Sequence, residues 1–402
     1  MKYAKQILGL LMVTVAALLL AACGQKSNCS GISFGSGGGT GGSSNGGGVN
    51  SGGSVCGSGN NNSGGSVTDY FFFHGSSGAN NTINTASISG SLFQVLPGIS
   101  IDVGQSIVGS MIVVNKKFLY IPDQNGSGGV MGFSINRSSG ALTEITGSPF
   151  AVAPSQITTL AADPDANGGR FLFAADFTSG DLVVFTIDPT SGALTPVTGS
   201  PFPNSGFEAN HLKVDGTGNY LYASAGNTTG DVAGFLIDQN TGALSPVAGS
   251  PFALTVSQID VDPTGTFLLA VDGGASEINV IPIESGTGSL LLNSAVSYPT
   301  VDPVDGVLIH PSGKFVYAFG GHVALEGFQF SSGTLTQLSG SPFSALPFLT
   351  DCQFDQNGTH LFGIKVPSSA VGVRLVDTNT GNVTAPIPDL GVPANPYFAP
   401  SN

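Results

Sequence analysis

A motif that recurs along the chain restricts its fold more than any other feature. Gly-Ser-Pro-Phe occurs at 147–150, 199–202, 249–252 and 340–343, each time shortly after a Gly-Ala-Leu or Gly-Thr-Leu segment. The phenylalanines are spaced by 52, 50 and 91 residues. A degenerate copy, 288–290 followed by 297–299, divides the long gap into two units. Self-similarity at a fixed period of this size is typical of repeat architectures.

Each repeat contains four strand patterns. An apolar-alternating segment ends in a turn such as Asp262-Pro263-Thr264-Gly265, and a second strand follows, as in 220–223. A third strand, such as 235–238, leads through a tight Gly turn to a fourth, which we expect to end at Ser-Pro-Phe. The 60 Gly and 24 Pro of the chain fall largely between these segments, where turns need them. Four strands in about 40–50 residues is typical of a propeller blade.

Counting the repeats predicts the number of blades. Six full units begin near residues 107, 156, 208, 256, 304 and 349. The C-terminus supplies one further strand, 395–400, and the N-terminal part of the body supplies three, at 69–73, 84–88 and 92–95. Together they make a seventh blade, which would leave the ring without an open sheet edge. We predict an all-β, seven-bladed β-propeller over 68–402, closed by N- and C-terminal strands in one blade. An array of β-sandwiches would not explain the terminal half-units.

The first 22 residues have the pattern of an export signal. Lys2 and Lys5 precede an apolar stretch, Ile7 to Leu20. Leu20-Ala21-Ala22-Cys23 resembles the lipobox of bacterial lipoproteins, which implies cleavage before Cys23 and a lipid on its sulfur. A plain secretory peptide and a transmembrane helix are the alternatives, and the short apolar run with a small-residue end favours cleavage. We therefore predict a membrane anchor at Cys23 and a place at the cell envelope, on the outer membrane or cell surface.

Residues 23–67 are predicted to be a tether. They consist almost wholly of Gly, Ser and Asn and cannot bury enough apolar surface to become ordered. Cys29 and Cys56 lie within it and could pair in an oxidising compartment. Cys352 falls in a predicted strand, where a buried thiol is expected.

The charge of the chain excludes some partners. Only 9% of the residues are charged, the net charge is −14, and the eleven Lys and Arg are scattered. Nucleic acid is therefore not an expected partner, because phosphates need clustered basic side chains. The acidity favours a soluble monomeric body. The His residues lack metal-ligand spacing, and we expect no metal or cofactor. The absence of Trp argues against WD40 blades and against quinoprotein propellers.

The order strand, Asp-Pro-x-Gly, Phe/Tyr-Leu-Tyr, Phe-x-Ile-Asp, Thr-Gly-x-Leu resembles the lactonase family of seven-bladed propellers. That family includes bacterial 6-phosphogluconolactonases and fungal carboxymuconate cyclases. The resemblance covers about 68–402 and implies lactone hydrolysis as a candidate activity. Its enzymatic members carry an Arg-His pair on an innermost strand and a Glu after the next strand. Here His211 matches the His, Asn210 replaces the Arg, and the position expected for the Glu is near Gly226.

Innermost strands line the channel of a propeller, so their early residues should surround one mouth. We therefore predict a polar ring of ligand-binding candidates: Asn210, His211, Ser257, Gln258, Asp305, Asp351 and Asn395. Residues one before each turn, such as Val214 and Val261, should form an apolar layer between blades. Such a site suits a small-molecule, glycan or protein ligand, and a wet channel that binds nothing is the alternative. We expect His310 to be a turn residue and His360 to face solvent or the blade edge.

Three functions remain open from the sequence. The first is a lipid-anchored binding or scaffold protein of the envelope. The second is a lactonase, in which His211 would act as a general base on water and Asp351 or Asp305 would orient it. The third is a structural or adhesion protein.

Overall fold

The computed structural model describes residues 69–400, apart from segments within that range. Those segments are 75–81, 90–91, 103–110, 124–127, 152–155, 178, 205–207, 226–230, 273–274, 321–322, 344–348, 366–369 and 391–396. The predicted signal peptide, Cys23, the tether with Cys29 and Cys56, and Asn395 lie outside the described residues. The described helices are two three-residue 3-10 turns, neither of which could span a bilayer.

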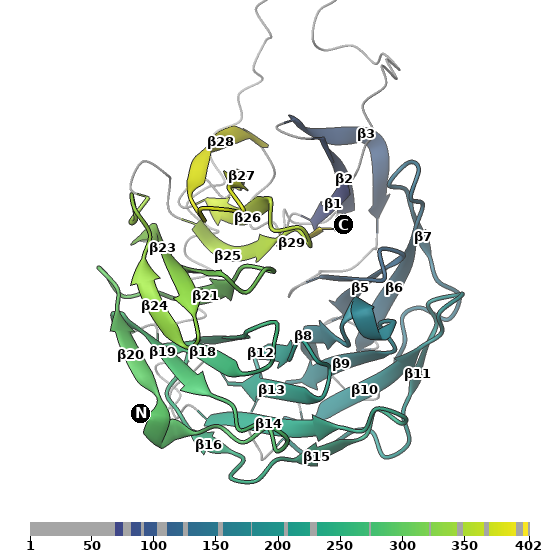
Figure 1. The fold of residues 1–402 in the computed structure, drawn as a ribbon. Coiled ribbons are helices and arrows are strands. Elements are labelled where there is room, and N and C mark those ends of the chain that lie inside the picture. The colour runs from purple at the N-terminus through teal and green to yellow at the C-terminus, as the bar shows by residue number, and fades with distance from the viewer. Residues whose placement is uncertain are drawn as a thin grey trace, which may run out of the picture. The chain divides into compact units, whose positions relative to one another are not determined.

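The described strands form seven sheets, which follow one another in chain order around a centre (Figure 1). We number these sheets as blades I to VII and list the strands of each blade from the innermost to the outermost. Blade I contains β29 (Tyr397–Pro400), β1 (Asp69–His74), β2 (Thr82–Ser89) and β3 (Leu92–Asp102). Blade II contains β4 (Ile112–Val114), β5 (Phe118–Asp123), β6 (Gly129–Ile135) and β7 (Leu142–Glu144). Blade III contains β8 (Ile157–Ala162), β9 (Phe171–Asp176), β10 (Leu182–Ile187) and β11 (Leu194–Pro196), with η1 (Asp165–Asn167) after β8.

The remaining blades repeat this order. Blade IV contains β12 (His211–Val214), β13 (Tyr220–Ser224), β14 (Asp231–Ile237) and β15 (Leu244–Pro246), and β16 (Phe252–Ala253) also pairs with β14. Blade V contains β17 (Gln258–Val261), β18 (Phe267–Val271), β19 (Glu277–Pro282) and β20 (Val296–Pro299), with η2 (Leu292–Ser294) before β20. Blade VI contains β21 (Gly306–Ile309), β22 (Phe315–Gly320), β23 (Val323–Ser331) and β24 (Thr334–Gln337). Blade VII contains β25 (Leu349–Phe354), β26 (His360–Lys365), β27 (Ala370–Val376) and β28 (Val383–Leu390).

The first and last strands of the described chain share one sheet. β29 pairs antiparallel with β1, so that Phe72 lies opposite Ala399. The ring of Phe71 in blade I stacks on Phe362 of blade VII with centroids 4.5 Å apart. These contacts join the two ends of the repeat array.

Second strands are mostly apolar and buried because blades pack on both of their faces. All six residues of β9 and of β22 are buried, whereas in the outer strand β11 only Leu194 is buried and the next two residues are exposed. Residues just before the inner turns, such as Val214 and Val261, are buried in apolar clusters that side chains of two adjacent blades form together. The apolar core is therefore distributed among the blades.

On the second strand of blades I to VI, an aromatic ring covers a glycine of the next blade. Gly192, at the turn before β11, has φ +76°, and a Cβ there would lie 2.5 Å from the Phe118 ring of blade II. The same contact recurs at five further seams: Tyr70 on Gly140, Phe171 on Gly242, Tyr220 on Gly288, Phe267 on Gly333 and Phe315 on Gly381. This explains the Gly before Leu in the repeat, because only Gly combines that backbone with that closeness.

A tyrosine two residues further along the second strand adds a hydrogen bond to the same turn. The hydroxyls of Tyr120, Tyr222 and Tyr317 donate to the carbonyls of Gly192, Gly288 and Gly381 at 2.7, 2.8 and 2.6 Å. Burial raises the pKa of each phenol, so the hydroxyl keeps its proton. The Phe/Tyr-x-Tyr signature is thus a contact between blades.

We expect Tyr222→Phe to lower the free energy of unfolding by about 1–2 kcal/mol, because the Gly288 carbonyl loses a buried donor. Tyr298→Phe is the matched control, since its hydroxyl is only partly buried and lies 3.1 Å from the Gly333 carbonyl. Urea unfolding measures both. Equal losses of unfolding free energy in the two variants would show that burial of the hydroxyl does not determine how much its hydrogen bond stabilises the fold.

The Ser-Pro-Phe motif does not end the fourth strand, contrary to the prediction. β7 stops at Glu144, the chain turns at Gly147 with φ +94°, and Phe150 exchanges both backbone hydrogen bonds with Val130 of the third strand. Ser148 Oγ accepts from the Gly132 amide at 3.1 Å. Pro149 has no amide hydrogen to continue a ladder, so the motif folds the chain back onto the third strand.

Candidate functional site

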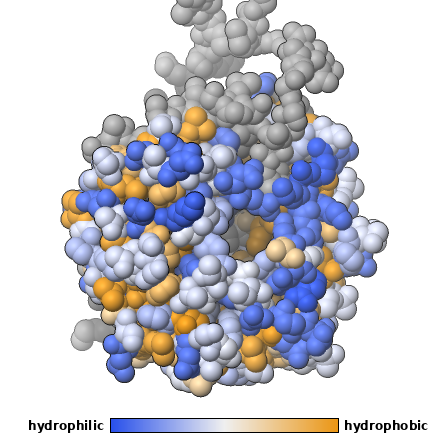
Figure 2. Space-filling model, viewed as in Figure 1, coloured by the Kyte–Doolittle hydropathy of each residue, from blue (hydrophilic) through white to orange (hydrophobic). Residues whose placement is uncertain are grey.

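A cavity of about 500 Å³ lies where the innermost strands meet. In Figure 2 a hollow opens near the middle of the face, with hydrophilic side chains gathered along part of its rim. Its lining comes from β4, β8, β12, β17, β21 and β25 and the residue before β12: Ile112, Thr158, Thr159, Leu160, Ala161, Ala162, Asn210, His211, Leu212, Lys213, Val214, Gln258, Ile259, Asp260, Val307, Leu308, Cys352 and Gln353. The volume falls in the range of about 300–1,000 Å³ typical of small-molecule sites.

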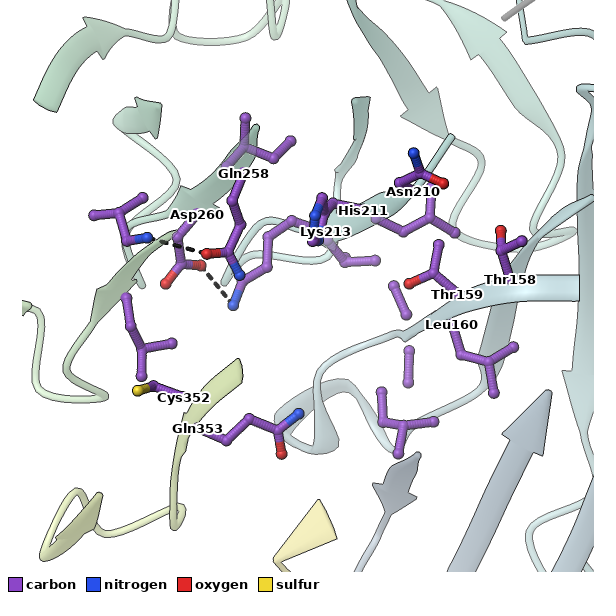
Figure 3. A pocket seen from close by; sticks show the side chains of 18 residues that line it. Thr158, Thr159, Leu160, Asn210, His211, Lys213, Gln258, Asp260, Cys352 and Gln353 are labelled. Carbon is purple, nitrogen blue, oxygen red and sulfur yellow. Dashed lines mark hydrogen bonds and ion pairs between the residues drawn. The ribbon is translucent and has the colours of Figure 1, made fainter. Parts of the chain in front are cut away.

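His211 opens strand β12 and lines the cavity (Figure 3). Burial lowers the pKa of its imidazole from the ordinary 6.5 to about 4, because desolvation penalises the charged ring. Within the described chain no hydrogen bond reaches either ring nitrogen. His211 therefore presents a neutral ring with one donor and one acceptor at physiological pH.

Lys213 follows two residues later and faces the cavity from the same strand. Its Nζ lies 2.6 Å from Asp260 Oδ1 on β17, and the two side chains are 41% and 3% exposed. Asp260 also accepts from the amides of Val261 at 2.9 Å and Ile309 at 2.7 Å. Both carboxylate oxygens are thus occupied, while the ammonium keeps donors toward the cavity (Figure 3).

Sequence reasoning missed this pair. The predicted ring occupies the position four before each turn, whereas Lys213 and Asp260 lie two before it. Side chains on a strand alternate between faces, so these two positions share the channel face. Because of this alternation, Lys213, Asp260 and Gln353 join His211 and Gln258 in the lining of the cavity. The expected apolar layer between blades therefore lies beside a second set of polar side chains.

The predicted ring is only partly gathered at the cavity. Asn210, His211 and Gln258 line it. Ser257 and Asp305 do not: the Ser257 hydroxyl donates to the Asp305 carbonyl at 3.1 Å, and Asp305 is exposed. Asp351 belongs to β25, but its side chain and Asn395 fall outside what is described. A ligand-binding role for the ring stays a prediction.

Polar side chains on the inner strands also join neighbouring blades. Gln258 Oε1 accepts from the Val307 amide at 3.0 Å, and the Thr158 hydroxyl donates to the Ala209 carbonyl at 3.1 Å. Within blade IV, the side-chain amide of Asn210 donates to the Ala225 carbonyl at 2.5 Å. Each of these residues therefore has part of its hydrogen-bonding capacity committed to the wall of the cavity.

The turn end of the inner strands carries a bond between blades that are not neighbours. Gln356, in the turn between β25 and β26, donates to Asp165 of η1 in blade III at 2.9 Å. Asp165 also accepts from the Asn115 amide of blade II at 2.8 Å. Blade VII is thereby held to blade III from across the array.

Two histidines outside the cavity have structural roles. His310 is a buried turn residue, as predicted, with Ser312 and the Gly358 carbonyl at 2.7 and 2.9 Å from its ring nitrogens. The prediction for His360 is wrong: its ring is buried and lies 2.8 Å from Asp355. Asp355 occupies the turn position of blade VII, and its carboxylate draws the ring inward.

Cys352 is a buried core residue, as expected.

The depressed pKa of His211 predicts a pH-dependent stability. Between pH 4 and 6.5 the unfolded chain binds more protons at this residue than the folded chain, so stability falls as the pH drops through that window. We expect wild type to lose about 1–2 kcal/mol more than His211→Gln between pH 7 and pH 5. Urea unfolding at both values checks this. His310, whose pKa burial also lowers, contributes equally to both proteins. Parallel pH profiles would contradict the prediction.

Comparison with known proteins supports the fold and the family resemblance. The family model "Lactonase, 7-bladed beta-propeller" matches residues 161–255, a span that includes His211 and Lys213. No curated protein matches this chain in sequence.

Several solved structures share the fold. A protein from Bacteroides fragilis proposed to be a 6-phosphogluconolactonase superposes with a TM-score of 0.61 at 17% identity, over 83% of this chain and 97% of that one. A protein from Bacteroides uniformis with the same proposed activity gives a TM-score of 0.63 at 15% identity, over 82% and 99%. The periplasmic gluconolactonase PpgL of Pseudomonas aeruginosa gives 0.59 at 15%, over 82% and 98%. With seven sheets among its described residues, six of four strands and one of five, and with this family match, the chain is a seven-bladed β-propeller that resembles the lactonase family.

Proposed function

We propose that this protein is an envelope lipoprotein whose propeller binds a small polar molecule in the central cavity. The observation that carries the proposal is the neutral His211 ring, which faces a cavity of about 500 Å³ without a hydrogen bond inside the described chain. The ring nitrogens are not among the buried polar atoms that lack a partner, so a molecule in the cavity can complete their hydrogen bonds. A ligand with hydroxyl or carbonyl groups would do so.

The geometry favours binding over proton transfer. A general base works best with a pKa near the working pH, and the pKa of His211 is lowered to about 4. In active sites an orienting group commonly holds the base, yet the nearby Asp260 is committed to Lys213 and two backbone amides. His211 is therefore suited to accept or donate one hydrogen bond to a ligand.

Ligand-detected NMR on the full chain tests the proposal with a panel of monosaccharides, sugar acids and lactones. We expect at least one member to bind, and His211→Leu to weaken it about tenfold or more. The matched control is Lys314→Ala, which changes an exposed residue outside the cavity. Binding that is indifferent to His211→Leu, or no binding at all, would contradict the proposal.

A lactonase is the second candidate function. The family model covers the strand that bears His211, and structures sharing the fold include a gluconolactonase. The proposal then requires ligand binding to raise the pKa of His211 so that it can activate water. An assay on glucono-δ-lactone and 6-phosphogluconolactone decides it: hydrolysis above background that His211→Gln abolishes supports the lactonase, and rates equal to background exclude it.

Anchoring through Cys23 and the role of residues 24–67 as a tether are parts of the same proposal. They rest on the lipobox-like 20–23 segment and on the Gly/Ser/Asn composition. Metabolic labelling with a fatty acid, followed by fractionation, should find the chain lipidated and in the membrane fraction, and Cys23→Ser should release it. An unlabelled chain that stays with the membrane would overturn the anchor. A purely structural or adhesive role would appear as a protein partner whose capture is unaffected by His211→Leu.

A further inference from the structure

The charges around the cavity restrict which small molecules it can take, an inference that rests on the proposed binding function. Of the described lining residues, only Lys213 and Asp260 carry charge at neutral pH, and they are 2.6 Å apart. Their charges cancel, and the imidazole beside them is neutral. The described lining therefore has no net charge.

The surroundings oppose an anion. The whole chain carries a net charge of −14, and Asp305 is exposed on the turn that leads into β21. The potential of such a protein lowers the local concentration of anions at its surface. An anionic group at Lys213 would also lie close to the Asp260 carboxylate, so attraction and repulsion would largely offset each other. Lys213 is thus poorly placed to supply net binding energy to a phosphate or carboxylate.

The uncommitted groups suit hydroxyls instead. No hydrogen bond within the described chain involves the Gln353 amide, the Gln258 Nε2 or the ring nitrogens of His211, and Lys213 keeps donors beyond the one facing Asp260. Amides and imidazole each offer a donor and an acceptor, as a hydroxyl does. Leu160, Ala161 and Leu308 add apolar surface to the same cavity.

From this charge balance we infer that the channel selects neutral, hydroxyl-rich ligands of monosaccharide size and discriminates against their phosphorylated forms. Asp260 is the specificity-determining residue: it cancels the charge of Lys213 and holds its ammonium against the cavity wall. Lys213 then acts as a hydrogen-bond donor to a hydroxyl, with its charge already balanced.

The test compares matched sugars that differ in charge. Glucose, mannose and galactose are each measured beside their 6-phosphate and 2-amino forms, by calorimetry on the full chain. We expect the neutral form of at least one sugar to bind at least tenfold more tightly than either charged form. Asp260→Asn gives the described lining a charge of +1 and should reverse the order of neutral and phosphorylated forms. Lys213→Gln should weaken binding of the 6-phosphate forms further.

The matched control is the double change Lys213→Gln with Asp260→Asn. It leaves the described lining uncharged and should restore the wild-type order. If Asp260→Asn does not fold, Lys213→Gln still carries the test, because it gives the described lining a charge of −1 and should weaken binding of the phosphorylated form. Tighter wild-type binding of a phosphorylated or amino sugar, abolished by His211→Leu, would overturn the inference and leave the cavity as a binding site. If none of the nine sugars binds, the inference is wrong. The proposed function is then also wrong only if no sugar acid or lactone of the wider panel binds.

Discussion

Replacing Gly192 with alanine is expected to lower the free energy of unfolding by about 2–4 kcal/mol, through backbone strain and overpacking. The residue has φ +76°, where a Cβ costs about 1 kcal/mol. The new methyl would lie 2.5 Å from the Phe118 ring and 2.7 Å from Ile145, well inside van der Waals contact. The ring is buried between two blades and cannot swing away, so the seam between blades II and III must separate. Urea unfolding measures the loss.

Two other glycines separate backbone strain from overpacking. Gly286 and Gly340 have φ +80° and +88°, and a Cβ at either would meet nothing within 4 Å. Gly286→Ala and Gly340→Ala should therefore lose only about 1 kcal/mol. The excess in Gly192→Ala measures the contact with the neighbouring blade. Equal losses in all three variants would mean that the aromatic cover contributes nothing.

Asp260→Ala is the second large effect, with an expected loss of about 2–4 kcal/mol. The carboxylate accepts from the buried amides of Val261 and Ile309, and alanine leaves both without an acceptor. Lys213 contributes less to the loss, because its side chain is 41% exposed and its ammonium can turn toward water in the cavity. The cost should therefore fall below the 3–5 kcal/mol of breaking a fully buried ion pair.

Amide hydrogen exchange locates the effect of Asp260→Ala. The Ile309 amide, on the innermost strand of blade VI, should lose protection first, since it has lost its acceptor in blade V. Lys213→Gln is the control: it removes the ion pair, keeps both amide bonds and should cost about 1 kcal/mol or less. A Lys213→Gln variant as unstable as Asp260→Ala would show that the ion pair, and not the amides, stabilises the wall.

The strand order of each blade could be predicted because the repeat shows it several times. One copy of Tyr220-Leu221-Tyr222 is ambiguous, but its recurrence beside Gly turns identifies a second strand. The course of Ser-Pro-Phe could not be predicted in the same way. Its fold-back onto the third strand depends on the Ser148 hydroxyl and the Gly132 amide, which are sixteen residues apart. The same bond recurs in other repeats, but its donor is a backbone amide, which no residue type identifies in a sequence.

The candidate site was less accessible to sequence reasoning. His211 could be placed because one column of inner-strand positions was followed around the ring. Lys213 and Asp260 lie 47 residues apart in different repeats, and their pairing follows only once adjacent blades are stacked. The depressed pKa of His211 likewise depends on burial by several blades together. The sequence patterns therefore identified residues of the cavity wall, but they could not show that the charges of Lys213 and Asp260 pair there.

The pairing of β29 with β1 has a consequence for how the chain acquires its structure during synthesis. Strand β1, with Tyr70, Phe71 and Phe72, emerges early, yet its inner neighbour comes from the far end of the chain. Until Tyr397–Pro400 are available, an aromatic strand has one unpaired edge, which is open to pairing with another nascent chain. The six blades between them can stack as they appear. That blade is complete only once Tyr397–Pro400 have emerged, and a product truncated before them remains an open array.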